Sequence, residues 1–130
     1  MVLVFNHHPS LGPHEGKELE LMLQNKKELS LFYTDSEIPE AFLPYIKKGR
    51  FYCKVLKHKL FVKDEYVDFE FYIISQEPNT PNVYKLSKAL GESLKVKFSP
   101  DLEREIGLLL GYNDSDIEYY IQHSLKTHQR

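Results

Sequence analysis

The chain lacks several features that mark specialised classes of protein. It has a single cysteine, Cys53, so no disulfide can form within it, which is typical of a reducing compartment. No apolar run approaches the roughly 20 residues that a membrane-spanning helix needs. Residues 1–8 lack the basic segment and the long apolar stretch of a secretion signal. We therefore expect a cytoplasmic protein without a membrane span.

The chain also has no large excess of positive or negative charge. Seventeen Lys and Arg against nineteen Asp and Glu leave a net charge of −2, so the whole molecule is not a general binder of polyanions. Hydrophobic residues make up 42% and charged residues 28%, which is typical of a folded, soluble chain. A length of 130 residues suits one hydrophobic core. The sequence predicts one domain spanning residues 1–130.

The motifs of common enzyme chemistry are also missing. The sequence has no glycine-rich phosphate loop and no Gly-x-Ser-x-Gly elbow. Two carboxylate pairs share a helix face at a spacing of four residues: Asp101 with Glu105, and Asp114 with Glu118. Both pairs fall in expected first turns, where acids complement the helix dipole. Cys53 and His58 should point to opposite faces of a strand. The sequence therefore favours a protein without a catalytic residue or cofactor over an enzyme.

The strongest structural pattern lies in residues 50–75. Two runs rich in β-branched and aromatic residues flank a charged pair at 63–64, which predicts a hairpin with its tight turn there. That register opposes charges of opposite sign on one surface, with Lys59 facing Asp68 and Lys57 facing Glu70. Apolar residues gather on the other surface, so we expect the hairpin to bury that side.

Helix-start signals divide the C-terminal part of the chain. Thr80 and Ser99 each precede a proline that a first helical turn tolerates, and both can cap the helix that follows. Gly111 ends the second helix, and Asn113 can cap a third. Apolar residues recur at helical spacing after each cap.

Shorter elements are expected nearer the N-terminus. Helical spacing appears around residues 19–23 and 41–46, and alternation over residues 29–33 predicts a strand. The fold class is therefore α+β, with a small antiparallel sheet built around the central β-hairpin, packed by helices and followed by a helical C-terminal segment.

Histidines near the N-terminus raise the question of a metal site. His7, His8 and His14 lie close to Glu15, and these side chains can bind zinc. Residues 14–18, however, read HEGKE, so glutamate replaces the second histidine of the helical His-Glu-x-x-His signature. A polar loop is the favoured interpretation. A small metal-binding protein or enzyme that uses these four residues is the first alternative function.

Basic residues are concentrated between residues 47 and 63, where no acid occurs. A nucleic-acid surface made of lysines and interleaved aromatics is the second alternative. Its candidate residues are Lys47, Lys48, Arg50, Phe51, Tyr52, Lys54 and Lys57. Because Asp68 and Glu70 oppose two of the hairpin lysines, we favour a charge-paired sheet face over nucleic-acid binding.

Acids gather beside tyrosines near the C-terminus. Between residues 101 and 118, six acids accompany one basic residue, Arg104. Two helices joined at residues 111–113 superficially resemble a helix-turn-helix, but the second begins DSDIE, which phosphates would repel. Tyrosines provide a large contact area, and carboxylates can meet a basic partner. This composition favours a protein-binding surface.

Several segments carry a resemblance to known proteins. The run HEGKELELML at residues 14–23, followed by LFY at 31–33 and LGY at 110–112 before an acidic helix, looks like small uncharacterised bacterial proteins. That resemblance implies no activity, cofactor or catalytic residue. The acids and tyrosines are also similar to the inhibitory surface of bacterial nuclease-immunity proteins. Those proteins are smaller and all-helical, so the expected hairpin leaves only a likeness of surface chemistry.

These observations together predict a small cytoplasmic bacterial protein that binds a partner protein stoichiometrically, as an inhibitor or regulator. The expected contact residues are Tyr112, Asp114, Asp116, Glu118 and Tyr119. Homodimerisation through an exposed hairpin edge stays open as well.

Overall fold

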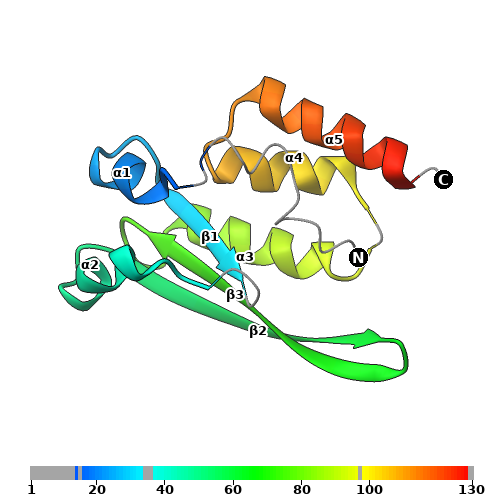
Figure 1. The fold of residues 1–130 in the computed structure, drawn as a ribbon, viewed down its shortest axis with the longest axis horizontal. Helices are drawn as coiled ribbons and strands as arrows, with labels where there is room; N and C mark the ends of the chain where they lie inside the picture. Colours follow the sequence, from blue (N-terminus) through cyan, green and yellow to red (C-terminus); the bar gives the residue numbers. More distant parts are fainter. Residues whose placement is uncertain (1–13, 15, 34–36, 97, 129–130) are drawn as a thin grey trace.

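The computed structural model describes residue 14 and residues 16–33, 37–96 and 98–128 of the chain. Its elements, in chain order, are α1 (Glu18–Leu23), β1 (Leu29–Tyr33), η3 (Glu40–Phe42), α2 (Leu43–Lys47), β2 (Tyr52–Val62), β3 (Glu65–Ser75), α3 (Pro81–Ser93), α4 (Pro100–Leu109) and α5 (Asp114–His128). Helices α3, α4 and α5 lie on one side of the sheet, and α1 and α2 lie near one end of it (Figure 1). The predicted α+β class is confirmed.

The sheet has the strand order β1-β3-β2, and both pairings are antiparallel. The hairpin register predicted from the charges is confirmed, with Lys57 opposite Glu70 and Lys59 opposite Asp68. The two turn residues, at 63 and 64, have φ angles of 50° and 65°. Left-handed backbone at both central positions gives the two-residue turn whose twist matches that of a hairpin.

Two apolar clusters cover opposite faces of the sheet. The larger lies between the sheet and α3, α4 and α5, and its fully buried members include Phe71, Ile73, Leu86, Leu90 and Ile121. The smaller comprises Met22, Phe32, Phe42, Phe51 and Ile74, from α1, β1, the η3 segment, the residue before β2, and β3. Successive residues of β3 alternate between the two clusters, as strand geometry requires. Each fully buried side chain of this size contributes about 1.5–3 kcal/mol.

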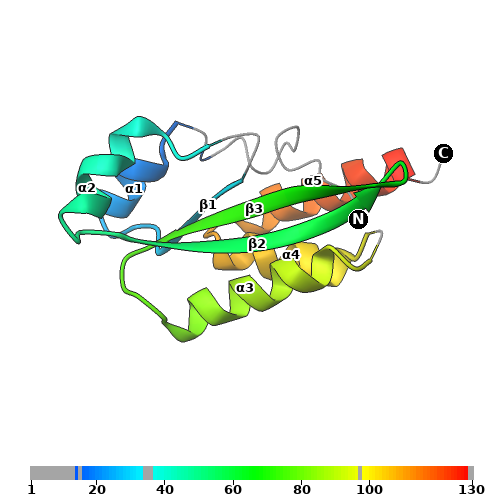
Figure 2. The same cartoon turned by 90° about the horizontal axis from the view of Figure 1, so that it is seen from below.

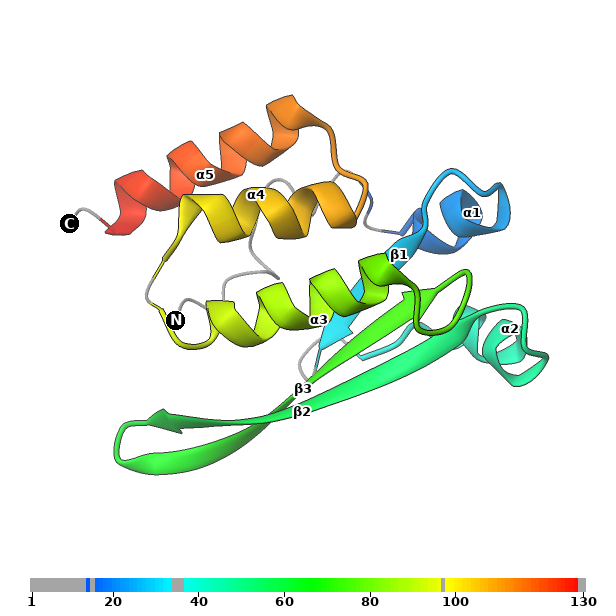
Figure 3. The same ribbon diagram turned by 180° about the vertical axis from the view of Figure 1, so that it is seen from behind.

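The hairpin is longer than the rest of the sheet. β1 pairs with β3 only from Phe71 to Ser75, whereas the β2–β3 ladder continues to the pair of Val62 with Glu65. Figures 2 and 3 show the far end of the hairpin extending past β1. The register therefore produces a two-stranded projection from a three-stranded sheet.

The expected helix caps are present. The Thr80 hydroxyl accepts a hydrogen bond from the backbone N–H of Val83 at 3.2 Å, and the Ser99 hydroxyl accepts one from Leu102 at 3.3 Å. Asn113 Oδ1 accepts a hydrogen bond from the N–H of Asp116 at 2.8 Å. Such caps are worth about 1 kcal/mol each, because they satisfy amides that have no partner within the helix.

Close packing between α4 and α5 depends on Gly107. A Cβ atom at this position would lie 2.8 Å from Cγ1 and 2.9 Å from Cδ1 of the buried Ile117. We expect Gly107→Ala to lower the free energy of unfolding by about 1–3 kcal/mol through overpacking. The measurement is urea denaturation, with Gly91→Ala as the matched control.

A Cβ at Gly91 in α3 would meet only His58 Cε1, at an ordinary 3.8 Å. Because alanine favours a helix over glycine, Gly91→Ala should raise stability by about 0.5–1 kcal/mol. Similar changes for the two variants would contradict this account of the α4–α5 contact.

Candidate functional site

The distal end of the hairpin, residues 60–67, exposes large apolar side chains, and we call these residues the hairpin tip. Phe61 is 62% exposed and Tyr66 is 75% exposed, and their rings pack together with centroids 5.0 Å apart. Val62 and Val67 are 46% and 47% exposed. The sequence predicted a buried apolar side along the whole hairpin. That expectation is wrong at the tip, where Val67 is not covered by the helices.

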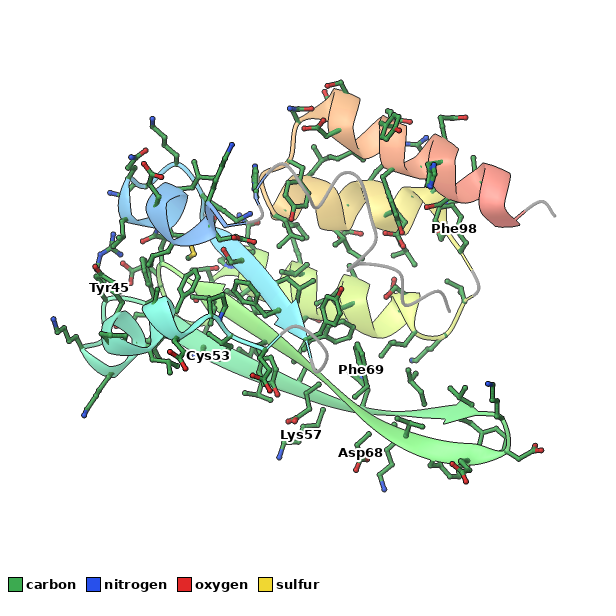
Figure 4. The ribbon with its side chains drawn as sticks, in the orientation of Figure 1. Tyr45, Cys53, Lys57, Asp68, Phe69 and Phe98 are labelled. Atoms are coloured by element: carbon green, nitrogen blue, oxygen red, sulfur yellow. The ribbon has the colours of Figure 1, made fainter. Side chains whose placement is uncertain are left out.

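Lysines lie on β2 immediately before the hairpin tip. Figure 4 shows Lys57 and Asp68 on the side of the hairpin away from the helices, with Phe69 pointing the opposite way. The cross-strand register was predicted correctly, but neither Lys57 nor Lys59 forms an ion pair with another described residue. A hollow of about 340 Å³ at this level is lined by Lys57, His58, Lys59, Asp68, Phe69 and Glu70.

The predicted basic segment does not present all its residues to one ligand. Phe51 is completely buried in the smaller cluster, so it cannot stack on a base. The Arg50 guanidinium lies 4.5 Å from the centre of that ring and donates a hydrogen bond of 2.6 Å to Gln76. Lys47 and Lys48 are exposed at the end of α2, and Tyr52 is 39% exposed. Lys54 and Lys57 fall on opposite faces of β2.

The predicted acidic surface on α4 and α5 is partly engaged within the protein. Glu118 forms an ion pair with Arg104 at 2.6 Å, and the Arg104 hydrogen bonds hold the pKa of Glu118 below its usual value. Tyr112 is only 8% exposed, so it offers a partner little area. Tyr119 is 61% exposed and stacks on His123, with centroids 6.3 Å apart.

The other two acids among the expected contact residues, Asp114 and Asp116, lie in the first turn of α5. Both complement the positive end of the helix dipole. The sequence predicted that Asp114 and Glu118 would lie in this turn, which is correct for Asp114 and wrong for Glu118. Burial therefore removes Tyr112 from the proposed contact set. Asp114, Asp116 and Tyr119 stay in it, and Glu118 keeps 46% of its side chain exposed beside Arg104.

A buried lysine joins the α1–β1 loop to the end of α4. Lys27 is 4% exposed, and its Nζ donates a hydrogen bond to the backbone carbonyl of Leu110, the C-cap residue of α4. The same Nζ lies 3.0 Å from His14 Nδ1 and 4.9 Å from the ring centre of Tyr112. Burial lowers the pKa of Lys27 to about 8. A cation at a helix C-terminus is stabilised by the dipole, so this contact fastens the loop to α4.

Of the four residues proposed for an N-terminal metal site, the structure describes only His14. His7, His8 and Glu15 lie outside the described residues. His14 packs against Tyr112, with ring centroids 4.4 Å apart, and burial followed by the charge of Lys27 lowers the pKa of His14 to about 4. No group of three or more His, Cys, Asp or Glu suited to a metal ion occurs in the described part of the chain.

Cys53 and His58 contact different parts of the protein, as their spacing predicted. Cys53 packs against the smaller cluster, and burial raises the pKa of its thiol. The His58 ring lies 5.9 Å from that of Phe71 in the larger cluster. The two side chains therefore do not form a thiolate–imidazole pair.

One unusual carboxylate was missed at the sequence level. Glu103 on α4 lies near Tyr120 of α5, and burial raises its pKa to about 7, an effect that a hydrogen bond from Tyr120 partly offsets. The apolar hairpin tip and buried Lys27 were missed as well. A signal for the tip was present, because FV and YV flank the turn on both sides. Lys27 and Glu103 gave no signal, since their surroundings come from distant segments.

No protein-family model, curated protein or solved structure matches the chain. Within the described residues, no helix has both the length and the apolar character that a membrane crossing requires.

Proposed function

We propose that this protein is a cytoplasmic bacterial protein-binding module, acting stoichiometrically as an inhibitor or regulator, and that the hairpin tip is its main contact element. The observation that supports this most strongly is the exposure of four large apolar side chains on a projecting hairpin: Phe61, Val62, Tyr66 and Val67. Exposed apolar groups of this kind commonly mark interaction sites, because their contact with water is unfavourable and ends when a partner covers them.

The chemistry of the tip suits an anchor. Phe61 and Tyr66 oppose each other across the hairpin and already touch, so they can enter a partner's pocket with little loss of side-chain entropy. Val67 is on the other face of the hairpin from these rings, since strand residues alternate. A partner groove that receives the tip from both sides would be filled by it, which is a direct means of inhibition.

The acidic surface provides a second contact under the same proposal. Asp114, Asp116 and Tyr119 lie on α5, and they suit a basic patch on the partner. Charged rim contacts mainly accelerate association, so we assign them a smaller part of the affinity than the tip.

Affinity capture tests this function. The intact protein is used as bait in a lysate of its source organism, beside a Phe61→Ala/Tyr66→Ala variant and an Asp114→Lys/Asp116→Lys variant. We expect one protein, retained at a fixed molar ratio, to be lost with the first variant and reduced with the second. Tyr84→Ala is the matched control, because Tyr84 is 65% exposed on α3. Equal retention by all four baits would contradict the proposal, as would self-association of the purified protein through the tip.

A further inference from the structure

β2 forms an outer edge of the sheet. In the described part of the chain its only strand neighbour is β3, on one side. The two-residue turn makes Val62 and Glu65 a pair that exchanges both backbone hydrogen bonds. Pairs that exchange backbone hydrogen bonds then alternate along the β2–β3 ladder with pairs that do not. The backbone N–H and C=O groups of the odd-numbered residues of β2 therefore point outward from the sheet, available to another strand.

The side chains of those outward-pointing residues share one face. Val55, Lys57, Lys59 and Phe61 alternate along β2, on the face where Figure 4 shows Lys57. All four are exposed, Val55 at 44% and Phe61 at 62%. The order along the edge is therefore apolar, basic, basic, apolar. β2 itself contains three lysines and no acid.

We propose that an extended acidic segment of the partner protein adds to β2 as a fourth strand, with carboxylates opposite Lys57 and Lys59 and apolar residues opposite Val55 and Phe61. This inference rests on the proposed protein-binding function and names the chemistry of the segment that is bound. Backbone hydrogen bonds to the outward-pointing groups provide affinity, and the alternate side chains provide selectivity. The pattern reads the same in both chain directions, so a parallel or an antiparallel segment satisfies it.

Charge argues against a second copy of this chain as the added strand. A fully overlapping antiparallel pair of β2 strands is centred on Lys57 and places this lysine opposite its own copy. Like charges in directly opposed positions destabilise a strand pair. Edge lysines are a common protection against such self-pairing. An acidic segment converts the same lysines from a repulsive into an attractive feature.

Synthetic peptides test the proposal on the intact protein. The probe is an amidated, acetylated peptide, Thr-Val-Thr-Glu-Thr-Glu-Thr-Phe-Thr, added to isotopically labelled protein and followed by two-dimensional NMR. We expect the amide signals of Val55, Lys57, Lys59 and Phe61 to shift and their hydrogen exchange to slow. A peptide with both glutamates replaced by lysine should bind at least about tenfold more weakly, since attraction becomes repulsion at two positions.

Two controls make the result decisive. Backbone N-methylation of the probe should abolish the shifts, because the ladder hydrogen bonds are lost. The two glutamates are methylated to block an antiparallel segment, and in a second peptide the threonines that follow them are methylated to block a parallel one. The protein variant Lys57→Gln/Lys59→Gln should lose the preference for the acidic peptide. Because both lysines are exposed and glutamine places no like charge opposite Glu70 or Asp68, this variant should keep the fold.

The outcomes separate this proposal from the function on which it rests. Binding of neither peptide at millimolar concentration would overturn strand addition, as would equal binding of the two. If a captured partner is nevertheless lost on substitution of Phe61 and Tyr66, the binding function stands without strand addition. If the acidic peptide binds but no captured partner is lost on substitution of Phe61 and Tyr66, strand addition at β2 is supported and the proposed function is contradicted.

Discussion

Replacing Glu103 by glutamine is expected to raise the free energy of unfolding at pH 8 by about 2 kcal/mol. Burial between α4 and α5 raises the pKa of this carboxyl from 4.5 to about 7. Because the folded protein holds the proton more tightly, Glu103 contributes stability that is fully present below pH 4.5 and is lost as the pH rises through 7. The full shift corresponds to roughly 3 kcal/mol, which partial solvent contact reduces.

Urea denaturation of Glu103→Gln and wild type between pH 5 and pH 8 measures this effect. The difference in stability should be small at pH 5, where both side chains are uncharged, and should grow with pH. Glu105→Gln is the matched control, because Glu105 is exposed on the same helix. A Glu103→Gln difference that is equal at pH 5 and pH 8 would show that Glu103 does not titrate in this way.

The double substitution Phe61→Ala/Tyr66→Ala should weaken binding of the captured partner by at least about 100-fold, or roughly 2.7 kcal/mol. Each ring is exposed in the free protein and becomes buried only in the complex, so truncation removes contact area that exists only there. Aromatic anchors at the centre of an interface commonly contribute about 2 kcal/mol or more each. Isothermal titration calorimetry gives both the affinity and the molar ratio.

The same substitution should leave the isolated fold nearly intact. Phe61 and Tyr66 form one cross-strand pair, which contributes about 0.2–1 kcal/mol to the hairpin. Tyr84→Ala removes a ring of similar exposure from α3 and should bind as wild type does. An affinity of Phe61→Ala/Tyr66→Ala within about threefold of wild type would remove the tip from the interface.

Much of the fold could be predicted because local patterns determine it. Alternating charges set the register of Lys57 with Glu70, since a slip by one residue would bring charges onto the apolar face. Thr80 and Ser99 located two helix starts, because a cap and a following proline act over a single turn. These features depend on residues that are close in the sequence.

The parts of the site that were missed depend on contacts between distant segments. Lys27 reaches the carbonyl of Leu110, a contact that no local pattern encodes. Val67 is exposed because the helices do not cover it, and alternation along β3 looks the same inside and outside the three-stranded region. Tyr112 carried the composition of a contact surface, yet it packs against His14 and Lys27. Composition alone therefore could not separate a surface tyrosine from a core one.

The most direct test of the proposed function is the hydrogen-exchange footprint of the complex. The intact protein is compared free and saturated with its captured partner by mass spectrometry, which reports backbone protection segment by segment. We expect the strongest new protection in residues 55–67, with weaker protection at the start of α5. Protection confined to α4 and α5, with no change in the hairpin, would contradict the proposed function.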